Sequence, residues 1–89
     1  MLTLPEVLTH SQAAEFSLGL KAQVAAQAAQ VVLEAGALKE FDSSALAVLL
    51  ACRREALAAG KTFSVQGLPG RLLQLASLYG VAELIPVAV

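Results

Sequence analysis

The chain of 89 residues contains few charged side chains, one cysteine, one histidine and no tryptophan. Because Cys52 is the sole thiol, no disulfide can form within the chain, and a Cys/His metal site is nearly excluded since His10 is the sole imidazole. Charged residues make up 15% of the sequence and leave a net charge of −1. No basic stripe is present that would attract nucleic acid.

The sequence also lacks an apolar run long enough to cross a membrane. The longest stretch free of charged and strongly polar residues, Ala45 to Cys52, is closed by Arg53-Arg54-Glu55. A spanning helix needs about 20 apolar residues, so this stretch is too short. No charged start followed by an apolar run opens the chain, which predicts that there is no signal peptide. We therefore expect a cytoplasmic protein.

What the chain does have is a high content of apolar residues. Hydrophobic residues make up 57% of the sequence, well above the average for a globular protein. This compensates for a length near the lower end of what sustains one core without metals or disulfides. We predict a single domain over residues 1–89, with part of its apolar surface packed against a partner.

Strand and helix patterns alternate along the chain. Thr9 and Gln12 have the spacing of a helix-starting capping box, and Gly60 is a natural residue at a helix end. The apolar segment Val31-Val32-Leu33 is typical of a strand covered on both faces. The order predicts an α/β fold, a mostly parallel four-stranded sheet with right-handed helical crossovers. Strands are expected over residues 1–4, 31–33, 62–66 and 84–87, and helices over 9–29, 42–59 and 69–79.

The helix predicted over residues 42–59 has two apolar stripes at helical spacing. One stripe is suited to face the sheet and consists of Ala45, Leu49, Cys52 and Ala56. Two interpretations of the second stripe remain open, because it can pack under a neighbouring helix or be exposed for a partner. It consists of Leu46, Leu50 and Leu57, beside Arg53 and Arg54.

Asp42, Ser43 and Ser44 stand where a loop becomes this helix. Their oxygens can accept hydrogen bonds from the unpaired amides of the first turn, and Asp42 complements the positive end of the helix dipole. A hydroxyl at this place can also carry a phosphate, which would disrupt a docked apolar partner. Capping alone and a phosphorylatable docking site, at Ser43 or Ser44, are therefore the two interpretations of this segment.

The sequence resembles the STAS domain family in the segment Phe41-Asp42-Ser43-Ser44-Ala45-Leu46. An apolar strand precedes this segment and the pattern Gly60-Lys61-x-Phe63-x-Val65-x-Gly67 follows it. The resemblance to the MlaB-like branch of the family covers about residues 31–86 and adds the segments Val65-Gln66-Gly67, Leu75-Ala76-x-Leu78-Tyr79-Gly80-Val81 and Leu84-Ile85-Pro86.

Three departures from the family pattern are visible. Ala45 stands where the family usually has glycine, and Glu34 stands where a shorter Asp is common. We expect the amino terminus to be too short for the family's opening hairpin, so that one edge strand is missing. An edge strand left exposed in this way would invite pairing with another chain, including a second copy of this one.

The resemblance implies a non-enzymatic accessory subunit without a cofactor. Such a subunit binds and regulates the cytoplasmic ATPase of an Mla-type ABC complex, which transports phospholipids and maintains the lipid asymmetry of the outer membrane. Its contact with the membrane permease is indirect, so the protein is expected to be peripheral to the inner membrane. The resemblance implies a partner-binding site made of Asp42, Ser43, Ser44, Leu46, Leu50 and Arg53.

Three alternatives compete with this interpretation. An anti-sigma factor antagonist, regulated by serine phosphorylation, shares the same motif, and in those proteins the phosphorylated residue corresponds to Ser44. A self-association module is favoured by the low charge and the exposed edge strand. An enzyme is disfavoured, because the only histidine lies far from Ser43 and Ser44 in the sequence and no glycine-rich phosphate loop is present.

Overall fold

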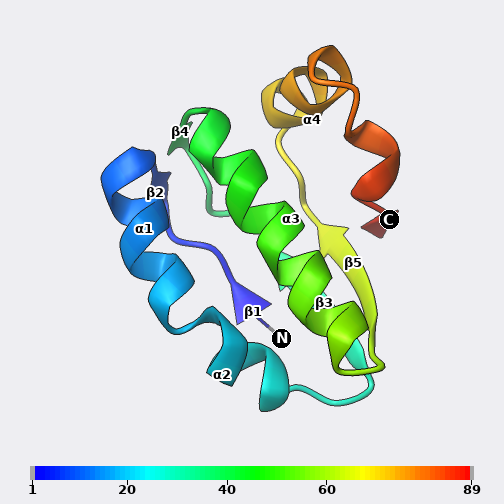
Figure 1. Cartoon of the computed structure of the whole chain (residues 1–89). Helices are drawn as coiled ribbons and strands as arrows, with labels where there is room; N and C mark the ends of the chain where they lie inside the picture. Colours follow the sequence, from blue (N-terminus) through cyan, green and yellow to red (C-terminus); the bar gives the residue numbers. More distant parts are fainter. Residues whose placement is uncertain (1, 89) are drawn as a thin grey trace.

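The computed structural model describes residues 2–88 and has an α/β fold in which every strand pair is parallel (Figure 1). The main sheet has four strands, which confirms the predicted fold class. Beside it lies a two-stranded ladder that was not predicted, since two-residue strands are too short to show a periodic pattern. The main sheet has the order β1 (Leu2–Thr3), β3 (Gln30–Glu34), β5 (Thr62–Gln66), β6 (Val87–Ala88), and the small ladder pairs β2 (Val7–Leu8) with β4 (Glu40–Phe41).

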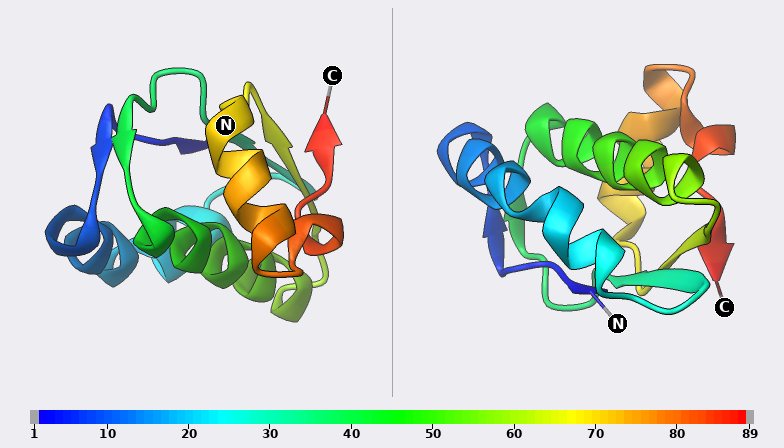
Figure 2. Two further views of the ribbon diagram at one scale, coloured as in Figure 1. Left: turned by 90° about the horizontal axis from the view of Figure 1, so that it is seen from above. Right: turned by 60° about the horizontal axis from the view of Figure 1, so that its bottom comes forward.

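The predicted helix over residues 9–29 is divided into two helices at Gly19, because glycine is a poor helix former. The other two predicted helices are present with small shifts of their ends, whereas the region before the last strand forms a short 3₁₀ helix. Figures 1 and 2 show the first three helices in one layer over a face of the sheet. The helices are α1 (His10–Leu18), α2 (Leu20–Ala25), α3 (Ser43–Ala58), α4 (Gly70–Leu78) and the 3₁₀ helix η1 (Ala82–Leu84).

The core lies between the sheet and α3. Val31 of β3 pairs in register with Phe63 of β5, and all three of Val31, Phe63 and Cys52 of α3 are buried. Burial raises the pKa of the Cys52 thiol to about 11. The expectation that β3 is covered on both faces is wrong, because Val32 lies opposite Ser64 on the other face and both are only half-buried.

Lys61 joins the end of α2 to the start of β5. Its ammonium donates hydrogen bonds to three backbone carbonyl oxygens, those of Val24 at 2.9 Å, Ala25 at 3.1 Å and Gln27 at 2.6 Å. The last carbonyls of a helix have no partner within the helix and carry the negative end of its dipole. Lys61 therefore satisfies them with a positive charge and ties α2 to the sheet.

Gly67 ends β5 in a crowded left-handed turn, with φ of +72°. The Glu34 carboxylate at the end of β3 accepts a hydrogen bond from the Gly36 amide at 2.7 Å. A Cβ atom on Gly67 would lie 2.7 Å from the same carboxylate oxygen and 3.1 Å from the backbone of Gly36. The longer Glu34 side chain thus fits this sequence because residue 67 has no side chain.

We predict that Lys61→Met lowers the free energy of unfolding by about 1.5–3 kcal/mol, since hydrogen bonds to charged groups contribute on this scale. Urea unfolding followed by circular dichroism measures the change. Lys39→Met is the matched control, because Lys39 makes an exposed ion pair with Glu6 at 3.6 Å and such pairs contribute less than about 1 kcal/mol. Equal losses for the two variants would show that the three carbonyl contacts do not stabilise the fold.

We also predict that alanine substitutions at two glycines of nearly equal φ destabilise the protein to different extents. Gly60, at φ of +73°, has open space where a Cβ would stand, so Gly60→Ala costs only the backbone strain of about 1–2 kcal/mol. Gly67→Ala adds crowding and is expected to cost about 1–3 kcal/mol more. Thermal unfolding of both variants tests this, and equal melting temperatures would contradict it.

Candidate functional site

The Asp42 carboxylate holds the first turns of two helices. Its Oδ1 accepts a hydrogen bond from the Ser44 amide at 2.8 Å, which makes Asp42 the N-cap of α3. Its Oδ2 accepts a hydrogen bond from the His10 amide, at the start of α1, at 3.2 Å. The two helices start side by side because the strands before them are paired, with Leu8 of β2 opposite Phe41 of β4.

This arrangement lowers the pKa of Asp42. The largest cause is the hydrogen bond from the Ser44 amide, and smaller ones are the Ser44 side chain and the amide and charge of His10. Partial desolvation acts in the opposite direction but does not reverse the shift. The carboxylate is thus held in its charged form, which is the form that complements the positive ends of both helices.

The two serines differ in how far they reach solvent. Ser43 is exposed, whereas Ser44 is half-buried and its Oγ lies 3.5 Å from the Nδ1 of His10. Sequence reasoning set His10 aside as distant, although it follows a strand just as Asp42 does. Helices that follow paired parallel strands start at the same edge of the sheet. This rule is the signal that would have placed His10 beside Ser44. Ala45, in place of the usual glycine, is fully buried inside α3.

The contact between Ser44 and His10 differs in geometry from a serine–histidine–aspartate relay. A serine nucleophile needs a histidine whose other ring nitrogen is oriented by a third group. Within residues 2–88 the Asp42 carboxylate bonds to the backbone amide of His10, and no hydrogen bond joins it to the imidazole ring. The three residues therefore form a capping cluster at the surface.

The predicted stripe along α3 is split between core and surface. Leu46 is 3% exposed and belongs to the core, so for this residue the packing interpretation holds. Leu50 and Arg53 are half-buried, and Leu57 at the far end of the stripe is 50% exposed. Of the six predicted partner-binding residues, Asp42, Ser43, Ser44, Leu50 and Arg53 can be reached from solvent, and Leu46 supports the helix from beneath.

Two hollows flank the start of α3. One, of about 390 Å³, lies between α1 and α3, where His10, Ser44 and Arg54 border a floor of alanines that includes Ala47. The other, of about 320 Å³, lies between β4 and α4. Its lining consists of Phe41, Arg71, Gln74, Leu75 and Leu78.

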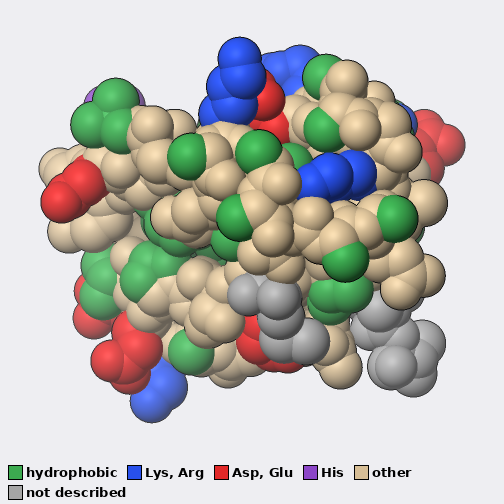
Figure 3. All heavy atoms as spheres, turned by 90° about the horizontal axis from the view of Figure 1, so that it is seen from below, with side chains coloured by type: hydrophobic (Ala, Val, Ile, Leu, Met, Phe, Trp, Pro, Cys, Tyr) green, Lys and Arg blue, Asp and Glu red, His purple; other side chains and the backbone are tan. Residues whose placement is uncertain are grey.

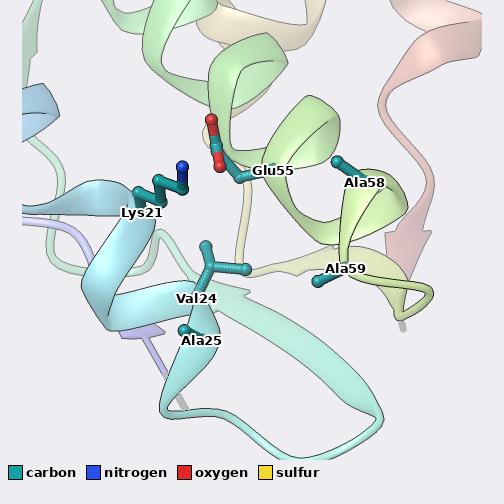
Figure 4. A pocket seen from close by; sticks show the side chains of 6 residues that line it. All are labelled: Lys21, Val24, Ala25, Glu55, Ala58 and Ala59. Carbon is teal, nitrogen blue, oxygen red and sulfur yellow. The ribbon is translucent and has the colours of Figure 1, made fainter.

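A further hollow, of about 420 Å³, lies between α2 and the last turns of α3. Figure 4 shows Lys21 and Glu55 pointing toward each other across it, above Val24. This hollow is at the end of α3 away from Asp42, so it is separate from the capping cluster. In Figure 3, which views the molecule from below, basic side chains gather at the upper margin, on the side of the helical layer.

We predict that Asp42→Asn destabilises the protein at neutral pH, because Asn has a single side-chain oxygen and can cap only one of the two helices. The folded-state pKa of Asp42 lies below its ordinary value of 3.8. The stabilisation that the Asp42 carboxylate contributes is therefore complete above that ordinary value and is lost as the pH falls through the folded-state pKa. Urea midpoints of both proteins between about pH 7 and about pH 2 should converge on the acid side.

The control for this experiment is Glu40→Gln, which removes an exposed carboxylate on β4. This variant should follow the wild-type curve closely. If the gap between wild type and Asp42→Asn stays constant into strong acid, the charge of Asp42 is not what joins the two helices.

No helix in the described part of the chain is both long and apolar enough to cross a membrane. No curated protein matches the sequence. The family model described as "Mlab, STAS domain" matches residues 1–86, which is nearly the whole chain. STAS domains are generally accessory or regulatory domains rather than enzymes. By this match the chain belongs to the STAS domain family, in its MlaB type.

Proposed function

We propose that this protein is a non-enzymatic accessory subunit that binds and regulates the cytoplasmic ATPase of an Mla-type phospholipid-transport ABC complex. Membership of the MlaB-type family supports this role. The observation that carries the proposal is the start of α3, where Ser43 is exposed and Ser44 half-exposed beside the fixed carboxylate of Asp42. Both hydroxyls are presented by a capped helix, so a partner meets them in one geometry.

The contact surface extends from the serines along α3. Leu50 and Arg53 follow Ser43 at helical spacing and are half-exposed, which gives an apolar and a cationic group further along the same side of α3. Leu46 contributes indirectly, since it is buried and fixes the helix against the core. Arginine is one of the residue types on which interface affinity commonly depends.

The proposal includes the absence of catalysis. The hydroxyl of Ser44 and the imidazole of His10 meet at the open surface, and the carboxylate of Asp42 is used by two backbone amides. A site that cleaves a substrate needs the carboxylate on the imidazole and oriented donors for the developing negative charge. The protein is proposed to act by binding, in the cytoplasm, and to be held at the inner membrane by its partner.

The test is co-purification of the Mla-type ATPase from the same genome with tagged wild type, Ser43→Asp and Ser44→Asp. An added carboxylate beside Asp42 is tolerated at a helix start but places like charges at the contact. We expect wild type to recover the ATPase and each Asp variant to recover at least about fivefold less. Ser17→Asp adds the same charge at the exposed far end of α1 and should recover as much as wild type.

Two outcomes would contradict the proposal. Wild type that recovers no ATPase, or that recovers a serine kinase with a sigma factor instead, overturns the assigned role in favour of an anti-sigma factor antagonist or another partner. Equal recovery with all four proteins keeps the ATPase as partner but removes Ser43 and Ser44 from the contact.

A further inference from the structure

The hollow between β4 and α4 contains an arginine that is already held in position. The guanidinium of Arg71 lies over the ring of Phe41, 5.3 Å from its centroid. Phe41 is half-buried and packs against the core, so the ring is a fixed platform for the cation. A cation over an aromatic face is stabilised by the ring, and less of its conformational freedom remains to be lost when a ligand binds.

No carboxylate of the described chain neutralises this arginine. Within residues 2–88 the structure has one ion pair, between Lys39 and Glu6, and it does not involve Arg71. The planar guanidinium presents several donors that match a carboxylate. Arg71 therefore offers a positioned positive charge to an anionic group from outside the chain.

Apolar side chains beside this charge are left in water. Leu78 is 78% exposed at the rim of the hollow, and the neighbouring Tyr79 is 57% exposed. Leu75 forms the half-buried floor. Covering such groups is favourable because apolar surface is removed from water. An occupant is thus expected to supply an apolar side chain as well as a negative charge.

We infer that this hollow binds a short segment of the partner ATPase in which an apolar side chain stands beside a carboxylate. The inference rests on the proposed function. In this arrangement the apolar side chain covers Leu75 and Leu78 and the carboxylate bonds to Arg71. The hollow lies near the capping cluster, because Phe41, which lines it, immediately precedes Asp42. One partner can therefore contact the start of α3 and this hollow together.

The groove between α1 and α3 fits such a segment less well. Its apolar lining consists of alanines and Val48, and within residues 2–88 the exposed Arg54 at its end lies over no aromatic ring. Because no ring holds the guanidinium of Arg54, it must lose more conformational freedom on binding than that of Arg71. Arg54 and the exposed Leu18 of α1 therefore serve as matched controls for Arg71 and Leu78.

The test is isothermal titration calorimetry of the purified ATPase with wild type and five variants. Arg71→Glu and Leu78→Asp are expected to weaken binding at least about tenfold. Arg54→Glu and Leu18→Asp introduce the same chemical changes at other exposed positions and should stay within about threefold of wild type. Phe41→Leu keeps an apolar residue but removes the ring. It should therefore weaken binding by an amount between the effects of Arg54→Glu and Arg71→Glu.

All four exposed positions can change without unfolding the domain, and thermal unfolding of each variant verifies this. If Arg54→Glu abolishes binding while Arg71→Glu does not, the partner occupies the other groove and the inference is overturned, although the ATPase remains the partner. If no variant weakens binding, the hollow is not part of the contact. If wild type itself does not bind, the proposed function fails and the inference fails with it.

Discussion

The hydrogen bonds of one carboxylate fix where the helical layer begins. Asp42 accepts the amides of both Ser44 and His10, so α1 and α3 start together and run in the same direction. Two adjacent parallel helices place the positive ends of their dipoles next to each other, which is unfavourable unless a negative charge lies between them. The low pKa of Asp42 ensures that this charge is present. At the opposite end of the layer, the ammonium of Lys61 meets the carbonyls of α2.

The parallel arrangement also explains why the candidate contacts lie together. Strands β2 and β4 are only two residues long, yet their pairing brings His10 next to Ser44 and sets Phe41 at the mouth of the hollow beside α4. A short ladder of this kind has little surface to bury. Its role is to align the starts of α1 and α3 at one edge of the molecule, where a partner can reach both.

The long elements could be predicted from sequence because their patterns are complete. The alternation in Thr62–Gln66 and the stripe of α3 residues that includes Leu49 and Cys52 need no other part of the chain to be interpreted. The break at Gly19 was missed because the apolar spacing continues across it, from Phe16 to Leu20. The pairing of His10 with Ser44 depends on a contact between segments far apart in the sequence, so local patterns do not contain it.

The candidate site, like the fold, could be predicted only in part from the sequence. Asp42 as a helix cap follows from residue type and position, and the structure bears it out. The second bond of Asp42, to His10, and the stacking of Arg71 on Phe41 both require the folded chain. Spacing on α3 placed Leu46 on the same stripe as Leu50, but how deeply each is buried depends on the neighbouring elements.

The single buried thiol has a practical consequence for experiments on this domain. Cys52 has no exposed surface and its pKa is raised to about 11, while the thiolate is the form that reacts with maleimides and similar reagents. At neutral pH the folded protein is therefore nearly inert to such reagents without any change to its sequence. A fluorophore or spin label attached to a cysteine introduced at a chosen surface position will report from that position alone.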